Sequence, residues 1–228
     1  MKVSIIIPVF NELKTIDIII NKIIEINLIK EIIVIDDFST DGTREKLSND
    51  IKNKIDQLIL NDKNFGKGYS IRQGIAKSKG DIILIQDADL EYDPSEYHKL
   101  LKPFVKYNAD VVYGSRFIGS EEKKVLFFWH TLGNKFLTLF SNILTNLNLT
   151  DMECCYKVFK SEVIKNIKLT ENRFGFEPEI TAKISKKDLK IFEVGISYNG
   201  RKYSEGKKIT WRDGFSAIRC IIKYNLFN

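Results

Sequence analysis

The sequence predicts an α/β fold with a doubly wound, mostly parallel sheet flanked by helices, and two observations lead to that prediction. Five short runs rich in Ile and Val recur through the first 114 residues, and segments of helical character separate them. Strands that alternate with helices in this way are typical of βαβ units with right-handed crossovers. The 228 residues, 43% of them hydrophobic, suffice for one sizeable core, so we expect a single domain over residues 1–228.

The five apolar runs are the expected strands. They are VSIIIPV (3–9), EIIVID (31–36), QLIL (57–60), DIILIQ (81–86) and DVVYG (110–114). Continuous rather than alternating hydrophobicity suits parallel strands that are buried on both faces. Helices are expected between them, over residues 14–27, 43–54, 67–78 and 94–107. The turn STDGT and the pair Pro94 and Ser95 supply helix-start residues after the second and fourth strands.

The pattern changes after residue 115. An apolar segment from Val125 to Leu147 predicts a helix, TDMECCYKVFK (150–160) predicts a compact loop, and KIFEVGISY (190–198) resembles a strand. We therefore expect residues 1–118 to bind a ligand at the strand ends and residues 119–228 to complete the site.

Charge and cysteine content narrow the function classes. The net charge is +6, but 36 basic residues are interleaved with 30 acidic ones, so no nucleic-acid-binding surface is predicted. Three cysteines without a repeated spacing argue against a disulfide framework or a zinc site and fit a cytoplasmic protein. The N-terminal apolar run meets Pro8 and then acid, which predicts a strand and neither a signal peptide nor a spanning helix.

Acidic residues follow three of the expected strands. Glu12 follows the first, Asp37 the second, and QDADLE, with Asp87, Asp89 and Glu91, the fourth. Because ligands of open α/β sheets bind at the carboxyl ends of strands, these acids are expected to meet at one edge, where they would repel each other without a cation. Oxygen ligands with no His or Cys nearby select Mg²⁺ or Mn²⁺. The alternative is a polar loop that caps a helix.

Other phosphate-binding motifs do not fit. A P-loop ending at Gly66 and Lys67 would need glycine at Asn61 and Ser or Thr at Gly68. A dinucleotide fingerprint that starts at Gly66 would need glycine at Ile71.

Five motifs in this order resemble glycosyltransferase family 2, with its GT-A, Rossmann-like fold: IIIPVFNE, VIDDFSTDGT, NFGKGYSIRQGI, ILIQDADLEYDP and VVYGSRF. They are most similar to the dolichyl-phosphate mannose synthase-like enzymes, which move a sugar from a nucleotide donor to a polyprenyl phosphate. The resemblance covers nearly the whole chain.

The resemblance implies roles for individual residues. The nucleotide pocket would be lined by Pro8, Phe10 and Glu12, and Phe10 stands where relatives often have Tyr. Asp37 would contact the base or ribose, and Asp87 and Ala88 would lie beneath the sugar nucleotide. Asp89 and Glu91 would bind the metal, and Arg116 would contact phosphates. Mannose synthases usually carry Gln at the position of Glu91, so GDP-mannose, UDP-glucose and UDP-N-acetylhexosamine all stay open as donors.

A basic segment, NGRKYSEGKKITWRDG (199–214), is expected to bind the acceptor phosphate. Related enzymes have a similar basic element, which carries a phosphate-binding role over to Arg201 and Lys207. We therefore count Asp89, Arg116 and Arg201 as the catalytic residues. A solvated basic loop is the alternative reading of this segment.

Residues 123–150 contain no acid, and apolar residues recur three or four apart from Val125 to Leu147. Polar residues interrupt this segment, so it lacks the roughly 18 apolar residues of a spanning helix. We expect an amphipathic helix lying on anionic lipid, with a second stripe at 211–226 beside it, and thus a peripheral protein on the cytoplasmic face of a membrane. Packing against the sheet or a second subunit is the alternative.

The expected reaction is an in-line displacement that inverts C1 of a hexose. A polyprenyl phosphate attacks and the nucleoside diphosphate leaves; since a phosphate with a second pKa of about 6 is already ionised, it needs no strong base. The alternative acceptor is a saccharide hydroxyl in cell-surface polysaccharide or glycan assembly, which would need a base such as Asp151, Glu177 or Glu179. A nucleotide-binding protein without turnover is a third hypothesis, which the intact acid set disfavours.

Overall fold

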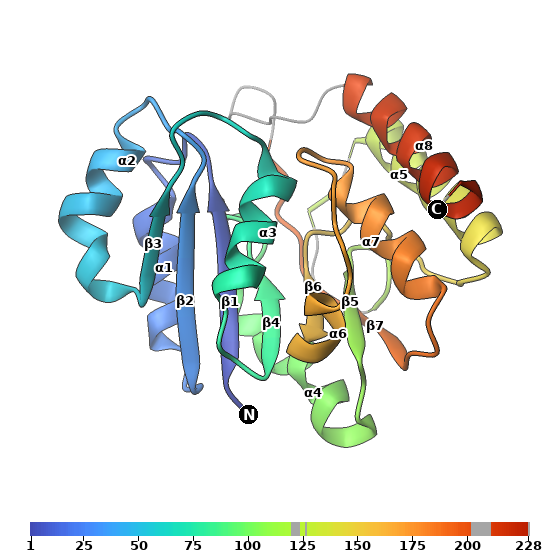
Figure 1. The fold of residues 1–228 in the computed structure, drawn as a ribbon, viewed down its shortest axis with the longest axis horizontal. Helices are drawn as coiled ribbons and strands as arrows, with labels where there is room; N and C mark the ends of the chain where they lie inside the picture. The colour runs from blue at the N-terminus through green and yellow to red at the C-terminus, as the bar shows by residue number, and fades with distance from the viewer. Residues whose placement is uncertain (120–123, 126, 202–210, 228) are drawn as a thin grey trace.

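The computed structural model describes residues 1–119, 124–125, 127–201 and 211–227. Within these ranges one seven-stranded sheet runs through the molecule (Figure 1) in the order β3-β2-β1-β4-β6-β5-β7. Its strands are β1 (Val3–Val9), β2 (Lys30–Asp36), β3 (Gln57–Leu60), β4 (Ile82–Ile85), β5 (Val111–Ser115), β6 (Lys157–Lys160) and β7 (Ile191–Gly195). The mostly parallel sheet and its five N-terminal strands are confirmed, and β7 lies where a strand was expected.

The strand β6 was not predicted, because TDMECCYKVFK reads as a loop. It pairs antiparallel with both β4 and β5 and so lies between them. Its first residue, Lys157, is fully buried, and the ammonium group donates hydrogen bonds to the carbonyl oxygens of Met152, at 2.9 Å, and Cys154. A four-residue strand with a buried, locally satisfied lysine has no apolar pattern to reveal it.

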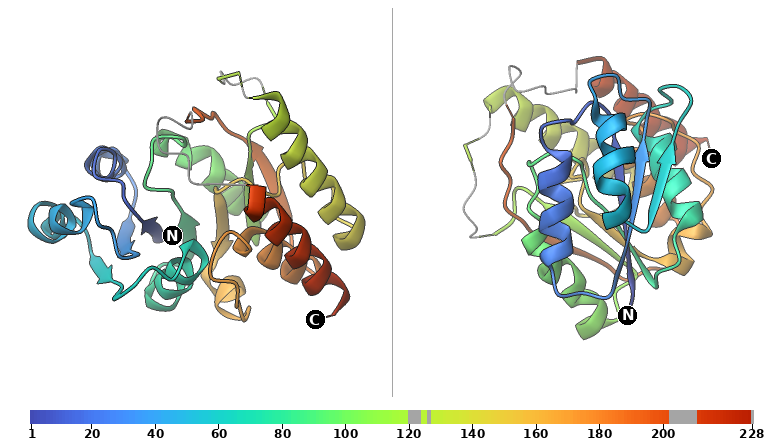
Figure 2. Two further views of the ribbon diagram at one scale, coloured as in Figure 1. Left: turned by 90° about the horizontal axis from the view of Figure 1, so that it is seen from above. Right: turned by 90° about the vertical axis from the view of Figure 1, so that its left-hand side faces the viewer.

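The helices cover both faces of the sheet. Figure 2 shows α1 (Ile16–Glu25) and α4 (Tyr97–Tyr107) on one face, and α3 (Lys67–Lys77) and α6 (Ser161–Lys165) on the other. The predicted helix 43–54 is a short α2 (Thr43–Lys46) followed by a π turn, Leu47–Ile51, and a 3-10 turn, Lys52–Lys54. A 3-10 turn, Pro94–Glu96, precedes α4, and its cap Asp93 accepts a hydrogen bond from the Ser95 amide at 2.9 Å.

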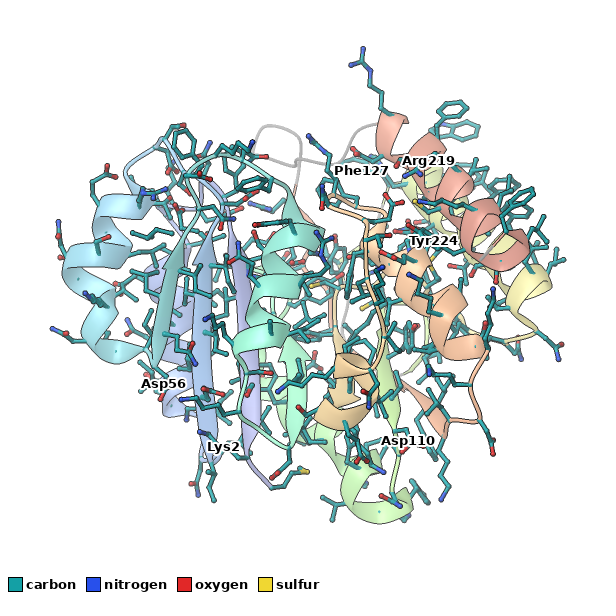
Figure 3. The ribbon with its side chains drawn as sticks, in the orientation of Figure 1. Lys2, Asp56, Asp110, Phe127, Arg219 and Tyr224 are labelled. Atoms are coloured by element: carbon teal, nitrogen blue, oxygen red, sulfur yellow. The ribbon has the colours of Figure 1, made fainter. Side chains whose placement is uncertain are left out.

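Three helices of the second half pack together beside β5 and β7. They are α5 (Phe128–Thr145), α7 (Phe176–Ser185) and α8 (Trp211–Leu226), and α5 and α8 run side by side in both views of Figure 2. Ala182 of α7 forms a small apolar cluster with Cys220 and Tyr224 of α8. Figure 3 places Tyr224 between α8 and α7, where its hydroxyl donates to Glu171 at 2.8 Å.

The burial pattern of α5 is the reverse of an ordinary surface helix. Its buried residues are the small polar Thr138, Ser141 and Thr145, three or four apart, and most of its large apolar residues are exposed. The exposed ones are Phe128, Trp129, Leu132, Phe136, Leu139 and Ile143. The predicted helix and its apolar stripe are confirmed, but the stripe does not pack on the sheet.

The adjacent helix α8 also exposes apolar side chains, along with Arg212 and Arg219. Ala217, Cys220, Ile221 and Tyr224 are buried, whereas Phe215 and Leu226 are exposed. Among the described residues, no helix is both long and apolar enough to cross a bilayer. We call the outward residues Phe128, Trp129, Leu132, Phe136, Leu139, Ile143, Phe215 and Leu226 the apolar face.

The loop before α7 docks on the start of α3 and depends on two glycines. Gly66 has φ +103°, and a Cβ there would lie 2.5 Å from the Asn172 carbonyl oxygen. A Cβ on Gly68 would lie 2.5 Å from the Glu171 carbonyl oxygen. These close approaches, with a hydrogen bond from the Tyr69 amide to the Asn172 carbonyl at 3.0 Å, hold the NFGKG motif against the second half.

Gly68→Ala is therefore expected to destabilise the protein by about 1–3 kcal/mol, because the new methyl group meets backbone atoms that cannot move freely. At an open helical position the same change stabilises by about 1 kcal/mol. Gly133→Ala in α5 is the matched control, since a Cβ there meets nothing within 4 Å. Urea unfolding of both variants measures the two effects; equal changes would contradict the close packing at Gly68.

Candidate active site

A cavity of about 800 Å³ opens at the carboxyl ends of β1, β2, β4 and β5. Ten predicted site residues line it: Pro8, Phe10, Glu12, Asp37, Asp87, Ala88, Asp89, Glu91, Arg116 and Arg201. Lys207, predicted to bind phosphate, lies outside the described residues. The cavity extends to α5 and α8, where His130, Leu137 and Ala217 contribute to its wall. One cavity thus joins the strand ends to the helices that carry the apolar face.

The first half fixes Asp37 through the backbone of the NFGKG motif. Its carboxylate accepts hydrogen bonds from the amides of Phe65, at 3.0 Å, and Gly66, at 2.7 Å, and from the Asn61 side chain at 2.8 Å. Asp37 is buried except where it meets the cavity. It therefore orders the loop that leads into α3 as well as lining the site.

Arg201 lies at the centre of an acidic cluster formed by Glu12, Asp89 and Glu91. Its guanidinium lies 2.5 Å from Asp89, 3.1 Å from Glu12 and 3.4 Å from Glu91, and its backbone amide donates to Glu91 at 2.8 Å. The Tyr198 hydroxyl also donates to Glu91 at 2.8 Å. Residues almost 200 positions apart therefore meet at one point.

In the part of the chain that the structure describes, Arg201 is the cation that pairs with all three of these carboxylates. Burial, followed by the charges of Asp87 and Glu91, raises the pKa of Asp89 to about 7 despite the opposing effect of Arg201. Among the described residues, no three His, Cys, Asp or Glu side chains are arranged as a metal site. The donor chemistry nevertheless fits a hard divalent cation, because Asp89 and Glu91 offer carboxylate oxygens, and Mg²⁺ commonly completes its shell with water and substrate phosphate.

Lys67 connects the two halves of the site and was not predicted. Its ammonium lies 2.9 Å from Asp87 at the end of β4 and 3.4 Å from Glu177 in the first turn of α7. Burial opposes its charge, but Asp87 raises the pKa of Lys67 well above its usual value. Burial likewise opposes ionisation of Asp87, yet Lys67 lowers the pKa of Asp87 overall. The position of Lys67 in NFGKG, at the start of a helix after the third strand, was the available signal.

Arg116 lies in a buried ion pair that the sequence did not reveal. Its Nε and one terminal nitrogen each donate to Asp151 at 2.6 Å, and its backbone amide donates to the same carboxylate at 3.0 Å. The ring of Tyr198 lies against the guanidinium, with its centroid 5.2 Å from the central carbon. Asp151 thus holds Arg116 against the cavity wall, and because both its oxygens are engaged it is a poor candidate for a general base.

Asp151→Ala is expected to lower the free energy of unfolding by about 3–5 kcal/mol, because it leaves a buried guanidinium without its partner. Guanidinium chloride denaturation measures the change. Lys22→Ala is the control. Lys22 pairs with Asp93 at 2.7 Å, but the two side chains are 44% and 40% exposed, so the expected loss of unfolding free energy is about 0–1 kcal/mol. Equal costs for the two variants would show that Arg116 does not depend on Asp151.

Of the other predicted acids, only Glu177 reaches the cavity. Glu179 is fully buried, and its oxygens accept hydrogen bonds from the Thr170 and Glu171 amides and from Lys183. Glu153, which was not predicted, also lines the cavity.

Known proteins resemble this chain in sequence. The sequence model of glycosyl transferase family 2 matches residues 4–168. An uncharacterized protein of Methanocaldococcus jannaschii is 30% identical, over 96% of this chain and 97% of that protein. A dolichol-phosphate mannosyltransferase of Pyrococcus furiosus is 28% identical over 91% of this chain, and dolichyl-phosphate beta-glucosyltransferase ALG5D of Trichomonas vaginalis is 27% identical over 86%. The chain spans 59% and 65% of the lengths of these last two relatives.

Solved structures resemble its fold. Glucosyl-3-phosphoglycerate synthase from Mycobacterium tuberculosis, in complex with Mn²⁺, UDP and glucosyl-3-phosphoglycerate, superposes with a TM-score of 0.76 and 17% identity. The likeness covers 98% of this chain and 80% of that one. At this identity the comparison concerns the fold.

Proposed function

Because the chain belongs to glycosyl transferase family 2 and is therefore a glycosyltransferase, with a GT-A fold, we propose that it transfers a hexose from a GDP- or UDP-sugar to a polyprenyl phosphate with inversion at C1. One observation carries the proposal: a single cavity is lined both by the acidic cluster and by α5 and α8, whose outer sides form the apolar face. A charged donor and a lipid-linked acceptor can therefore approach the same point from different sides.

The cavity-lining side chains within residues 1–118 are assigned to the sugar-nucleotide donor. Pro8, Phe10, Glu12 and Asp37 line the nucleotide end, and Asp87 and Ala88 lie where the sugar nucleotide passes the end of β4. Asp89 and Glu91 would hold Mg²⁺ or Mn²⁺, which when bound neutralises charge on the diphosphate. Crystal structures of the Mycobacterium tuberculosis synthase contain Mn²⁺ or Mg²⁺ with UDP, which supports a metal-assisted donor site here.

Cationic groups are assigned to the phosphates. Arg116 is held rigidly by Asp151, and a planar guanidinium can bind phosphate oxygens in pairs. Arg201 comes from the segment that leads to Lys207, so donor binding and acceptor binding meet at this residue. An oxygen of the acceptor phosphate attacks C1, the bond from C1 to the diphosphate oxygen breaks, and the nucleoside diphosphate leaves with the electron pair. The acceptor is already ionised, so the step requires no proton transfer.

The apolar face supports a membrane-bound acceptor. Large apolar side chains on two adjacent helices face outward, whereas the buried positions of α5 are small and polar. Exposed apolar surface of this extent marks a contact with lipid or protein. The neighbouring Lys124 and Lys135, with no acid over residues 123–150, favour an anionic bilayer. We propose that residues 119–228 place the protein peripherally on the cytoplasmic face of a membrane.

A second candidate, transfer to a saccharide hydroxyl, is favoured by one observation. Glu177 is buried at the cavity wall, and its Oε2 has no hydrogen-bond partner among the described residues. It is therefore better placed than Asp151 or Glu179 to remove a proton from a hydroxyl acceptor.

The deciding experiment incubates the purified protein with Mg²⁺ or Mn²⁺, a short polyprenyl phosphate, and GDP-mannose, UDP-glucose or UDP-N-acetylglucosamine in turn. Mass spectrometry should detect one glycolipid, and EDTA should abolish it. Donor binding without any lipid product would overturn the polyprenyl-phosphate proposal in favour of a saccharide acceptor.

A further inference from the structure

Two carboxyl groups besides Asp87 line the cavity, and each has one oxygen without a hydrogen-bond partner among the described residues. Glu153 belongs to the segment between α5 and β6, and Glu177 to the first turn of α7. Both line the cavity. One oxygen of each, Oε1 of Glu153 and Oε2 of Glu177, is buried without a hydrogen-bond partner among the described residues. Buried polar atoms are ordinarily paired, so unpaired ones beside a cavity are places where a bound ligand or water can supply the partner.

The neighbouring cations compensate a charge on Glu153 only in part. Lys157 of β6 is directed to the carbonyl oxygens of Met152 and Cys154, and Arg116, which follows β5, is engaged by Asp151. Lys67 of α3 is shared between Asp87 and Glu177. The remaining charges near Glu153, those of Glu177 and Asp151, are negative.

Glu153 is consequently expected to be a neutral acid in the folded protein near pH 7. Burial, and then the charge of Glu177, raises the pKa of Glu153 to about 8, and Lys157 and Arg116 offset this only in part. A neutral carboxylic acid both donates and accepts a hydrogen bond, as a sugar hydroxyl does. The negative charge in the adjoining part of the cavity wall then comes from Glu177.

We infer that Glu153 positions the transferred sugar by hydrogen bonding one of its hydroxyl groups and, with Glu177, selects neutral hexoses over sugars that carry a carboxylate. This inference rests on the proposed function, because it assigns this part of the cavity to the sugar of the donor. The assignment follows from the connection through Lys67: Asp87, at the end of β4, and Glu177 bind the same ammonium group, so both carboxyl groups adjoin the expected place of the sugar. A carboxylate on the sugar would meet Glu177, whose partner Lys67 is already shared with Asp87; Arg173, which also lines the cavity, is exposed in the loop before α7.

The first test needs no ligand. Thermal unfolding of the wild-type protein and Glu153→Gln is followed from pH 5 to pH 9. Since the folded state holds the proton up to about pH 8 and an unfolded glutamate loses it near pH 4.3, the wild type should lose stability relative to the glutamine variant as the pH rises between these values. A difference in Tm between the two proteins that stays constant from pH 5 to pH 9 would show that Glu153 is not a neutral acid. This outcome does not depend on which group the protein transfers.

The second test concerns the sugar. Calorimetry compares the glucosyl and glucuronosyl esters of UDP, or the mannosyl and mannuronosyl esters of GDP, according to the nucleotide that binds. We expect the neutral ester to bind at least about tenfold more tightly, which corresponds to 1.4 kcal/mol. Above pH 8 the neutral ester should bind the wild-type protein more weakly, whereas its affinity for Glu153→Gln should not change. Glu153→Lys should reduce the preference for the neutral ester.

The outcomes separate the two proposals. If neither ester of either nucleotide binds, the proposed function fails. If a neutral donor binds and its uronate binds equally well, or if the pH dependence is the same in Glu153→Gln, the proposed function stands and the role of Glu153 is rejected.

Discussion

Replacing Asp89 by asparagine is expected to lower kcat/KM for sugar transfer by about 100- to 1000-fold. Asp89 follows the buried strand β4, and its carboxylate lies 2.5 Å from the guanidinium of Arg201. Asparagine keeps the shape but removes the negative charge that a divalent cation requires, so charge on the leaving diphosphate would be less well neutralised. Initial rates at saturating Mg²⁺ and over a range of donor concentrations give the change in kcat and KM separately.

Two measurements distinguish a metal ligand from a residue that only holds Arg201. If Asp89 binds the metal, Mn²⁺ affinity in the presence of UDP should fall at least about tenfold in Asp89→Asn, and excess metal should restore part of the rate. If Asp89 only holds Arg201 in place, Arg201→Lys should reproduce the loss of kcat/KM without changing Mn²⁺ affinity. Asp188→Asn is the matched control, since Asp188 is exposed in the loop between α7 and β7. A normal rate in Asp89→Asn would contradict the assignment.

The parts of the fold that follow from local pattern were predictable. The strands β1, β2, β4 and β5 are buried along nearly their whole length because helices cover both faces of the sheet, whereas the edge strand β3 is partly exposed. Their continuous runs of Ile and Val are visible in a short window of the sequence. The antiparallel β6 was not predictable in the same way. Its burial depends on two neighbouring strands and on carbonyl oxygens that accept from Lys157, and neither appears in a hydrophobic profile.

The residues of the site likewise divide into those that local sequence pattern predicts and those whose partners only the structure reveals. Strand ends predict where Asp37, Asp87 and Asp89 lie, because the topology of a parallel sheet fixes that edge. The partners of these residues come from distant segments: Arg201 reaches Glu12 across 189 positions, and Lys67 reaches Glu177 of α7. Such pairs depend on tertiary packing, so the sequence indicated the charges without indicating which of them meet. Arg116 was expected at phosphate, but its ion pair with Asp151 required the structure.

The orientation of α5 likewise needed the structure. Periodicity identified the stripe but not the side of the helix that packs, and Thr138, Ser141 and Thr145 form an equally regular polar stripe. The helix α5 packs on α7 and α8 with this small polar stripe buried, which leaves most of the large apolar residues exposed. The inverted pattern is what makes lipid contact the stronger reading of this helix.

Replacing Phe136 and Ile143 together by serine is accordingly expected to abolish binding to vesicles. The two side chains, 56% and 69% exposed, lie seven residues apart on the outward side of α5. Full burial of such a side chain contributes about 1.5–3 kcal/mol, so losing two should weaken membrane binding roughly 100-fold or more. Co-sedimentation with vesicles that contain anionic lipid measures the effect. Because neither residue packs in the core, thermal stability and donor binding should be unchanged.

A second pair of exposed apolar residues provides the control. Val105 in α4 and Ile29 before β2 are 78% and 70% exposed and lie outside the apolar face. If general hydrophobicity drives the binding, serine at these two positions should weaken it as much as serine at Phe136 and Ile143. If α5 instead contacts a second copy of the chain, the wild type should sediment as a dimer in the absence of lipid and the Phe136 and Ile143 variant as a monomer. Loss of vesicle binding confined to the α5 variant, with the wild type monomeric, would assign the apolar face to the bilayer, since only lipid then accounts for both results.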